Sequence, residues 1–372
     1  MHNPHRGFSH KIRQKRLSRV TYSLFDFFKH DRDFVILLGV LLIAAFFVAP
    51  YTEWARWFGF VISSYAVIGN DSIQTLGMFI TSNSHKVVWW KMWLFIGSIF
   101  VATVGYSWYM YGGDVSYERL QVEGLATHPG QFTFLQLTVP ILLLLLTRMR
   151  VPLSTTFLLL NMFSTETSLL WHMIRKSLLG YVTAFGMAFL LWYLASAREY
   201  QGKVSRSPAR WFVLQWLSTG LLWMSWLMQD GANIAVFLPR RMPVGILIVF
   251  VTLILAGLGI LLYDRGGKIQ HLVNEKSGIT DIRAATYVSL VYMSLLFFFK
   301  VLNRIPMSST WIFIGLLGGR ELGKSFHTPQ QYRYRAIKKS GVLIKRDLSY
   351  ACLGLVLSVL VALWINGGLT VR

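Results

Sequence analysis

Charge is scarce in this 372-residue chain, because only 14% of its residues are Asp, Glu, Lys or Arg. A soluble globular domain carries about 25% charged residues. The chain is 54% hydrophobic, and several nearly uncharged stretches reach roughly the 17–25 residues of a membrane span. These features predict an integral membrane protein. The apolar runs are helix-length and do not alternate with polar residues, so we expect an all-α bundle and not a barrel.

Acidic residues are especially few, with 16 Asp and Glu against 37 Lys and Arg, which gives a net charge of +21. The excess gathers in the N-terminal tail and in short loops, as the positive-inside rule describes. We therefore expect a lipid bilayer, and not nucleic acid, as the partner. The single cysteine, Cys352, excludes an intrachain disulfide. The sequence has no metal-ligand spacing, nucleotide loop or nucleophile elbow, so we expect neither an enzyme nor a cofactor.

Some apolar segments are too short to cross a bilayer core of ~30 Å, which needs about 20 helical residues. The segments fall at about 34–49, 57–82, 87–111, 132–147, 151–164, 178–197, 211–228, 231–239, 243–263, 284–302, 306–318 and 350–366. Short ones such as 151–164 and 231–239 are typical of broken or re-entrant helices, which occur where they are buried in protein or line a polar cavity.

One hexapeptide pattern occurs twice. Residues 151–156 read Val-Pro-Leu-Ser-Thr-Thr, and Ile-Pro-Met-Ser-Ser-Thr begins 154 residues later, at 305. A second pair, Gly-Asn-Asp at 69–71 and Gly-Ala-Asn at 231–233, lies at two expected helix breaks. Matching interruptions in two halves indicate a transporter binding site. We therefore predict two repeats, at 51–197 and 211–372.

Three basic blocks predict the orientation. They are the N-terminal tail at 1–33, the central loop at 198–210 and an expected loop at 333–346, and we place all three in the cytoplasm. A first transmembrane helix at 34–50 then carries the chain outward, so the two repeats start from opposite sides of the membrane. The prediction is an inverted repeat in a multi-pass plasma-membrane protein whose N-terminus is cytoplasmic.

Carboxylates and amides between apolar runs are candidates for an ion or substrate path, since such groups are costly within a membrane. The first half has Asn70, Asp71 and Gln74, and the second has Asp230 and Asn233. Their oxygens are hard ligands, suited to sodium or to a proton. We predict that Asp71, Gln74 and Asp230 couple a cation, with Asn70 and Asp71 as the candidate sodium site. The alternative is that these are solvated residues of surface loops.

Hydroxyl residues follow each proline. They are Ser154, Thr155 and Thr156 in the first half, and Ser308, Ser309 and Thr310 in the second. Ordinary helix capping is one interpretation. A buried helix N-terminus also offers free N–H groups and a positive dipole end, which bind anions. The duplication favours an anion held between two such ends. Flanking basic residues either attract that anion or snorkel to the headgroups: Arg148, Arg150, Lys300 and Arg304.

The four motifs together resemble the inorganic phosphate transporter (PiT) family. Each half of that family carries Gly-Ala-Asn-Asp-x-x-Asn and then Pro-x-Ser-Thr-Thr-His. The present chain reads IGNDSIQ at 68–74, VPLSTTF at 151–157, GANIAVF at 231–237 and IPMSSTW at 305–311. The resemblance implies a sodium- or proton-coupled phosphate symporter, often a homodimer. By position it assigns substrate binding to Asn70, Asp71, Ser154, Thr155, Thr156, Asn233, Ser308, Ser309 and Thr310.

The chain departs from the family pattern mainly in its second half. Ile234 and Phe237 stand where the family has Asp and Asn, and neither can ligate a cation. One cation position is therefore expected to be missing, unless Asp230 replaces it. Two alternatives stay open at this point. One is a permease for sulfate or another small oxyanion on the same fold. The other is a membrane sensor or assembly subunit that transports nothing.

Overall fold

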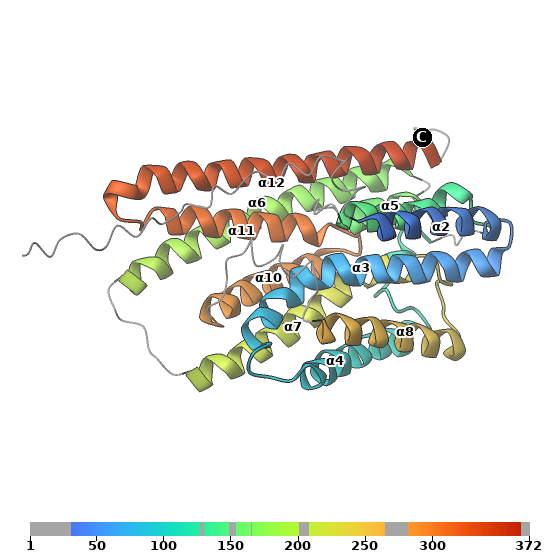
Figure 1. The fold of residues 1–372 in the computed structure, drawn as a ribbon, viewed down its shortest axis with the longest axis horizontal. Helices are drawn as coiled ribbons and strands as arrows, with labels where there is room; N and C mark the ends of the chain where they lie inside the picture. Colours follow the sequence, from blue (N-terminus) through green and yellow to red (C-terminus); the bar gives the residue numbers. More distant parts are fainter. Residues whose placement is uncertain are drawn as a thin grey trace, which may run out of the picture.

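The computed structural model describes residues 31–126, 130–148, 154–164, 166–200, 208–264 and 282–365. These residues form helices and connecting turns without a β-strand (Figure 1), which confirms the predicted all-helical fold. In chain order the α-helices are α2 (Arg32–Val48), α3 (Thr52–Asn83), α4 (Trp89–Met110), α5 (Phe134–Arg148), α6 (Thr167–Tyr200), α7 (Pro208–Ala235), α8 (Val244–Tyr263), α10 (Ile282–Leu302), α11 (Ser309–Ser325) and α12 (Gln330–Ile365). A short 3₁₀-helix, η1 (Arg119–Gln121), precedes α5, and a π-helix, η2 (Thr156–Leu160), follows it.

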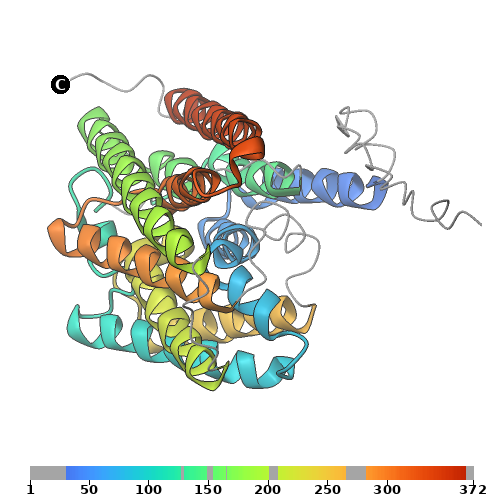
Figure 2. The ribbon, with the colours of Figure 1, turned by 90° about the vertical axis from the view of Figure 1, so that its left-hand side faces the viewer.

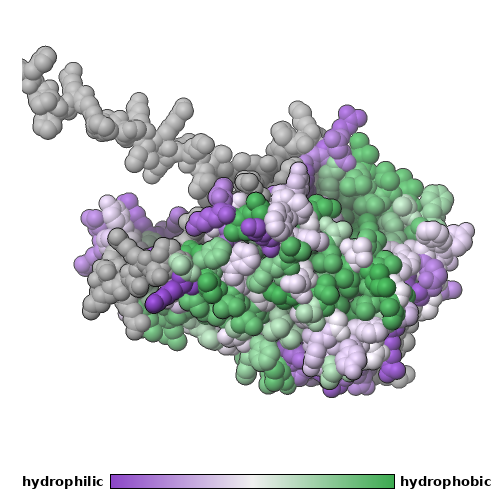
Figure 3. Space-filling view, turned by 90° about the horizontal axis from the view of Figure 1, so that it is seen from below, coloured by the Kyte–Doolittle hydropathy of each residue, from purple (hydrophilic) through white to green (hydrophobic). Residues whose placement is uncertain are grey.

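Five of these helices are long and apolar enough to cross a membrane: α4, the stretch Ser168–Ser196 of α6, α8, α10 and α12. Large apolar side chains on their outer faces are exposed, among them Ile248 and Ile260 of α8. Figure 3 shows a broad apolar surface on the side where α4 and α8 lie, with hydrophilic residues toward its margins. Soluble monomers rarely expose continuous apolar surface of this kind. The protein is therefore a membrane-embedded helical bundle.

The helices pack in layers. Figures 1 and 2 show α11 and α12 along one edge of the bundle and α4 and α8 along the opposite edge. The indole N–H of Trp93 on α4 donates to the Leu255 carbonyl of α8 at 2.8 Å. The Phe60 ring of α3 stacks on Phe250 of α8, with ring centroids 5.6 Å apart. Helices α3, α7 and α10 lie between these edges and supply the interior of the bundle.

Glycines allow α11 to pack very closely on α6. A Cβ atom at Gly315 would lie 2.4 Å from the Tyr181 carbonyl oxygen, and one at Gly319 would lie 2.1 Å from that of Phe185. Gly323, one turn further on, faces Phe189 in the same way at 2.6 Å. Small residues at a four-residue spacing let two membrane helices approach backbone to backbone. This stripe fixes α11 against α6 and so fixes the start of α11.

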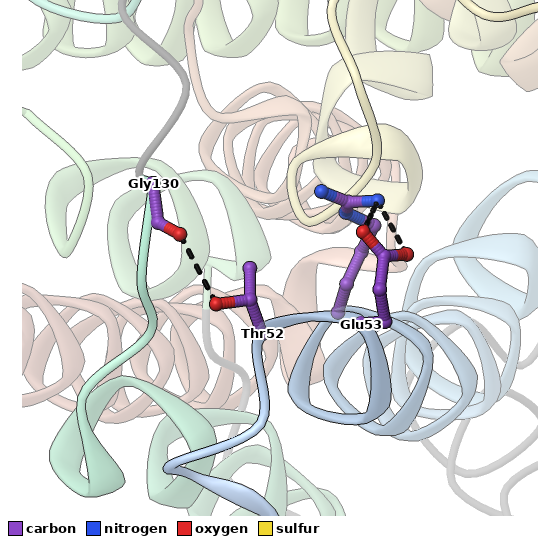
Figure 4. Close-up of polar contacts among 4 residues, drawn as sticks. Thr52, Glu53 and Gly130 are labelled. Atoms are coloured by element: carbon purple, nitrogen blue, oxygen red, sulfur yellow. Dashed lines mark hydrogen bonds and ion pairs between the residues drawn. The ribbon is translucent and has the colours of Figure 1, made fainter.

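Polar contacts tie the loops to the helix ends. At the start of α3, the Thr52 hydroxyl donates to the Gly130 carbonyl at 3.2 Å (Figure 4). Glu53 in the same turn pairs with Arg56 at 2.7 Å. Arg148 at the end of α5 pairs with Asp31, just before α2, at 2.5 Å. The Thr52 contact links α3 to the segment before α5, and the Arg148 pair links the end of α5 to the start of α2, whereas Glu53 and Arg56 pair within α3.

Three sequence predictions about local structure are wrong. Helix α3 continues through the expected break at 69–71, and α7 continues through the expected break between 228 and 231. The polar side chains there find partners inside the bundle, so the helix backbone does not need to open. The expected loop at 333–346 is the first half of α12. At 1.5 Å per residue, this 36-residue helix exceeds a bilayer core of ~30 Å, so its basic part can project beyond the apolar layer.

Candidate functional site

Both hydroxyl clusters lie at helix starts. The Ser154 hydroxyl accepts the backbone N–H of Phe157 at 3.2 Å, just before η2. The Ser308 hydroxyl accepts the backbone N–H of Trp311 at 3.4 Å, at the start of α11. Each cap joins the fourth residue of a hexapeptide to the residue directly after that hexapeptide. Ser154 and Ser308 therefore act as helix caps, as the capping interpretation predicts. Residues 150–153, including Arg150, lie outside the described residues.

The two helix starts touch each other inside the bundle. The Thr156 hydroxyl donates to the Met307 carbonyl at 3.3 Å. The rings of Phe157 and Trp311, one residue after each cluster, meet edge to face with centroids 6.5 Å apart. All six hydroxyl residues of the two clusters are buried. Two segments 154 residues apart in the chain thus place their N-terminal ends side by side.

Helix α3 brings Asp71 to the first cluster. Its side chain is fully buried, the Thr155 hydroxyl donates to Oδ2, and Asn70 Nδ2 donates to Oδ1 at 2.7 Å. One turn later, Gln74 Nε2 donates to the Thr310 hydroxyl at 3.3 Å. Helix α3 therefore contacts both hydroxyl clusters.

Helix α7 supplies the other acidic side chain. Asp230 and Asn233, three residues apart, lie on one helix face. The Thr156 hydroxyl lies 3.1 Å from Asp230 Oδ1. Asn233 Nδ2 donates to Thr156 at 3.0 Å and to Thr155 at 3.1 Å. Ser309 of the second cluster is a further neighbour of Asp230. We call Asp71, Thr155, Thr156, Asp230 and Asn233 the central polar cluster.

Three buried acceptor atoms in and beside this cluster are left without partners in the described part of the chain, as are the neighbouring Gln229 Nε2 and Ser72 Oγ. Gln74 Oε1, Asp230 Oδ2 and Asn233 Oδ1 are buried and have no hydrogen-bond partner among the described residues. A buried polar atom without a partner costs about 1–3 kcal/mol, and a charged one costs more. The two carboxylates also lie close enough to interact with each other electrostatically. A cation or a protonated group would satisfy these three acceptors.

Sequence reasoning missed three residues that support the second cluster. Arg119 of η1 is 1% exposed, and its guanidinium donates to Gln229 Oε1 at 2.6 Å and to the Ile305 carbonyl at 2.8 Å. Lys176 of α6 donates to the same carbonyl at 2.7 Å. The Tyr292 hydroxyl donates to the Ser309 carbonyl at 3.1 Å. Lys176 lies beside Arg175, just before the apolar run at 178–197, and this basic pair was a signal in the sequence. Nothing in its sequence neighbourhood distinguished Arg119.

Arg119 also bears on the charge of the site. Burial lowers the pKa of Arg119 to about 10, so the side chain keeps its charge at neutral pH. It interacts electrostatically with Asp230 but forms no ion pair with a carboxylate among the described residues. No three His, Cys, Asp or Glu side chains gather within metal-binding reach in that part of the chain.

Comparisons of the chain with protein-family models, with curated proteins and with solved structures found no match.

Proposed function

We propose that this protein is a secondary transporter that carries inorganic phosphate across the plasma membrane together with a cation. The observation that carries the proposal is the meeting of two hydroxyl-bearing helix starts beside two buried carboxylates, of which Asp230 keeps one unpartnered oxygen. Helix N-termini and hydroxyls suit an oxyanion, and the acceptors suit its companion cation. The motif resemblance to the PiT family supports the same conclusion.

Coupling follows from the hydrogen bonds of the central polar cluster. A threonine hydroxyl has a single proton to donate. In the geometry described, Thr155 donates to Asp71, and Thr156 faces Asp230 and the Met307 carbonyl. Neither proton is then available to an oxyanion. A sodium ion or a proton on the carboxylates would replace the bonds to Asp71 and Asp230, which frees the Thr155 hydroxyl and leaves Thr156 held by the Met307 carbonyl alone. Cation binding therefore precedes anion binding, which is the basis of symport.

Phosphate is favoured over sulfate by the unpartnered Asp230 Oδ2. Monohydrogen phosphate carries a P–OH group that can donate to a carboxylate oxygen, and sulfate has no such donor. A site that rewards a hydrogen-bond donor rejects the analogue that lacks it. Sulfate is therefore the natural competitor for measuring selectivity.

Helix directions support an alternating-access mechanism. In Figure 1, α3 and α7 run in opposite directions, and so do α6 and α12. These pairs occupy equivalent places in the two predicted halves, as an inverted repeat requires. Rocking of one half against the other would open the central polar cluster to each side of the membrane in turn.

Uptake by proteoliposomes tests the proposal. Labelled phosphate should enter when a sodium or proton gradient is imposed, and unlabelled sulfate should compete poorly. Thr155→Ala and Thr156→Ala should each lower uptake about tenfold, because each removes a hydrogen bond to a charged group, worth about 1.5 kcal/mol. The matched control is Thr286→Ala, which deletes a buried hydroxyl that donates only to the Ile282 carbonyl at 2.8 Å.

Two results would contradict the proposal. If purified wild-type protein moves neither anion under any gradient, the non-transporting sensor becomes the better account. If sulfate enters as fast as phosphate, a general oxyanion permease becomes the better account. Uptake by the Thr155 and Thr156 variants at the level of Thr286→Ala would separately show that the hydroxyls play no part.

A further inference from the structure

A basic cleft opens beside the second hydroxyl cluster. It has a volume of about 380 Å³ and is lined by residues of the α4–α5 connection and the end of α10, including Tyr117, Glu118, Arg119, Lys300, Asn303 and Arg304. The rim residues Asn303 and Arg304 are exposed, while Tyr117 and Arg119 at the back are buried. The cleft therefore leads from the surface to Arg119.

Positive charge exceeds negative charge in this cleft. Three cationic side chains line it, and Glu118 is the one carboxylate among its lining residues. Glu118 pairs with Arg304 at 2.8 Å, which leaves Arg119 and Lys300 without a carboxylate partner among the described residues. The Lys300 ammonium lies 5.2 Å from the Tyr117 ring centroid. Buried Arg119 Nε has no hydrogen-bond partner in that part of the chain.

The loop that presents Arg119 has a defined conformation, held by its own hydrogen bonds. Tyr117 and Glu118 both have positive φ angles, 54° and 64°, a conformation that is uncommon for such side chains. Asp114 holds the turn by accepting the backbone N–H groups of Ser116 at 2.6 Å and Glu118 at 3.1 Å. Strained residues persist only where their surroundings impose them, and they gather at functional sites.

Arg119 connects the cleft with the central polar cluster. Its Nη2 atom binds Gln229, the neighbour of Asp230, at 2.6 Å. Its Nη1 atom donates to the carbonyls of Asn303 and Ile305, at 3.1 and 2.8 Å, in the segment that leads to the second hydroxyl cluster. An anion held in the cleft would thus lie beside the segment that leads into the second hydroxyl cluster.

We propose that this cleft is a separate binding site for a doubly charged oxyanion such as monohydrogen phosphate, at the entrance to the central polar cluster. Lys300 and Arg304 attract the anion at the rim, and Arg119 marks its inner end. Glu118 opposes binding and keeps it weak enough for the anion to move on. The entrance role rests on the proposed transport function, whereas anion binding in the cleft does not.

The test is equilibrium dialysis of the purified protein against labelled inorganic phosphate, at low and at physiological ionic strength. Lys300→Gln and Arg304→Gln should each weaken binding about two- to fivefold, the range of partly exposed ion pairs. Glu118→Gln should tighten it by a similar factor. Arg241→Gln is the matched control, because Arg241 is exposed and does not line the cleft. The effects should shrink as salt screens the charges.

The opposite signs at Arg304 and Glu118 separate an anion site from a structural ion pair. If this pair only holds the loop, removing either partner should shift phosphate binding in the same direction, and that result would overturn the proposal. Unchanged binding in all three cleft variants would overturn it as well. With Thr155→Ala and Thr156→Ala combined, cleft binding should persist while uptake is lost. Failure of transport alone therefore leaves the cleft site standing.

Discussion

The two hydroxyl clusters each have a capping hydrogen bond, but the helices that they begin differ in length and in packing. The first begins η2, a π-helix of five residues. The second begins α11, a helix of 17 residues that the glycine stripe holds against α6. Short π-helical segments are rare and often occur at functional sites. The second cluster is therefore held in place by a long packed helix, whereas the first begins only a short helix. We call the second cluster the clamped side of the site and the first cluster the light side. We therefore expect the first cluster to move more during transport.

The two carboxylates differ in a parallel way. Both oxygens of Asp71 accept hydrogen bonds, from Asn70 and from Thr155. Asp230 uses Oδ1 for its partners and keeps Oδ2 free. Asp71 is therefore the carboxylate that holds the light side in place, and Asp230 is the one that offers a free oxygen to an incoming ion.

The largest expected effect comes from Asp71→Asn. The substitution removes the charge that both Asn70 and Thr155 stabilise, so we expect coupled phosphate uptake to fall roughly 100-fold or more, equivalent to about 3 kcal/mol. Uptake by proteoliposomes measures it, with the yield of monodisperse protein as the control for folding. Uptake at the wild-type rate would show that Asp71 does not hold the light side of the site.

Gly319→Ala tests the clamped side. The added methyl group would meet the Phe185 carbonyl oxygen at 2.1 Å, so α11 must move away from α6. We expect a loss of about 1–3 kcal/mol in stability, the usual range for overpacking, measured by thermal unfolding in detergent. Gly341→Ala is the control, since nothing lies within 4 Å of its added Cβ. Equal melting temperatures for the two variants would remove the distinction between clamped and light sides.

The sequence predicted the character of the site better than its backbone. Residue types near Asp71 and Asp230 pointed to ion chemistry, and the duplicated hexapeptides pointed to two helix starts, which the structure brings together. Helix breaks at those carboxylates were wrong, because the sequence does not say that side chains from other helices will satisfy them. Arg119 escaped notice for the same reason, since its partners are 110 to 186 positions away.

The smallest expected effect comes from Gln74→Ala. This change cuts the contact between α3 and Thr310 of the clamped cluster, a neutral hydrogen bond of 3.3 Å. Such a bond contributes about 0.5–1.5 kcal/mol, so KM for phosphate should rise about two- to tenfold with little change in maximal rate. A loss as large as that of Asp71→Asn would show that α3 acts on both clusters equally.

The most direct test of the account is the cation dependence of phosphate binding to the purified protein. Labelled phosphate should bind to the central polar cluster only when sodium is present or the pH is low enough to protonate a carboxylate. Binding to this cluster is measured as the phosphate binding that is lost when Thr155→Ala and Thr156→Ala are combined. Asp230→Asn should remove most of the cation dependence of that binding. Equal phosphate affinity in sodium and in sodium-free alkaline buffer would contradict the claim that a cation must first occupy the carboxylates.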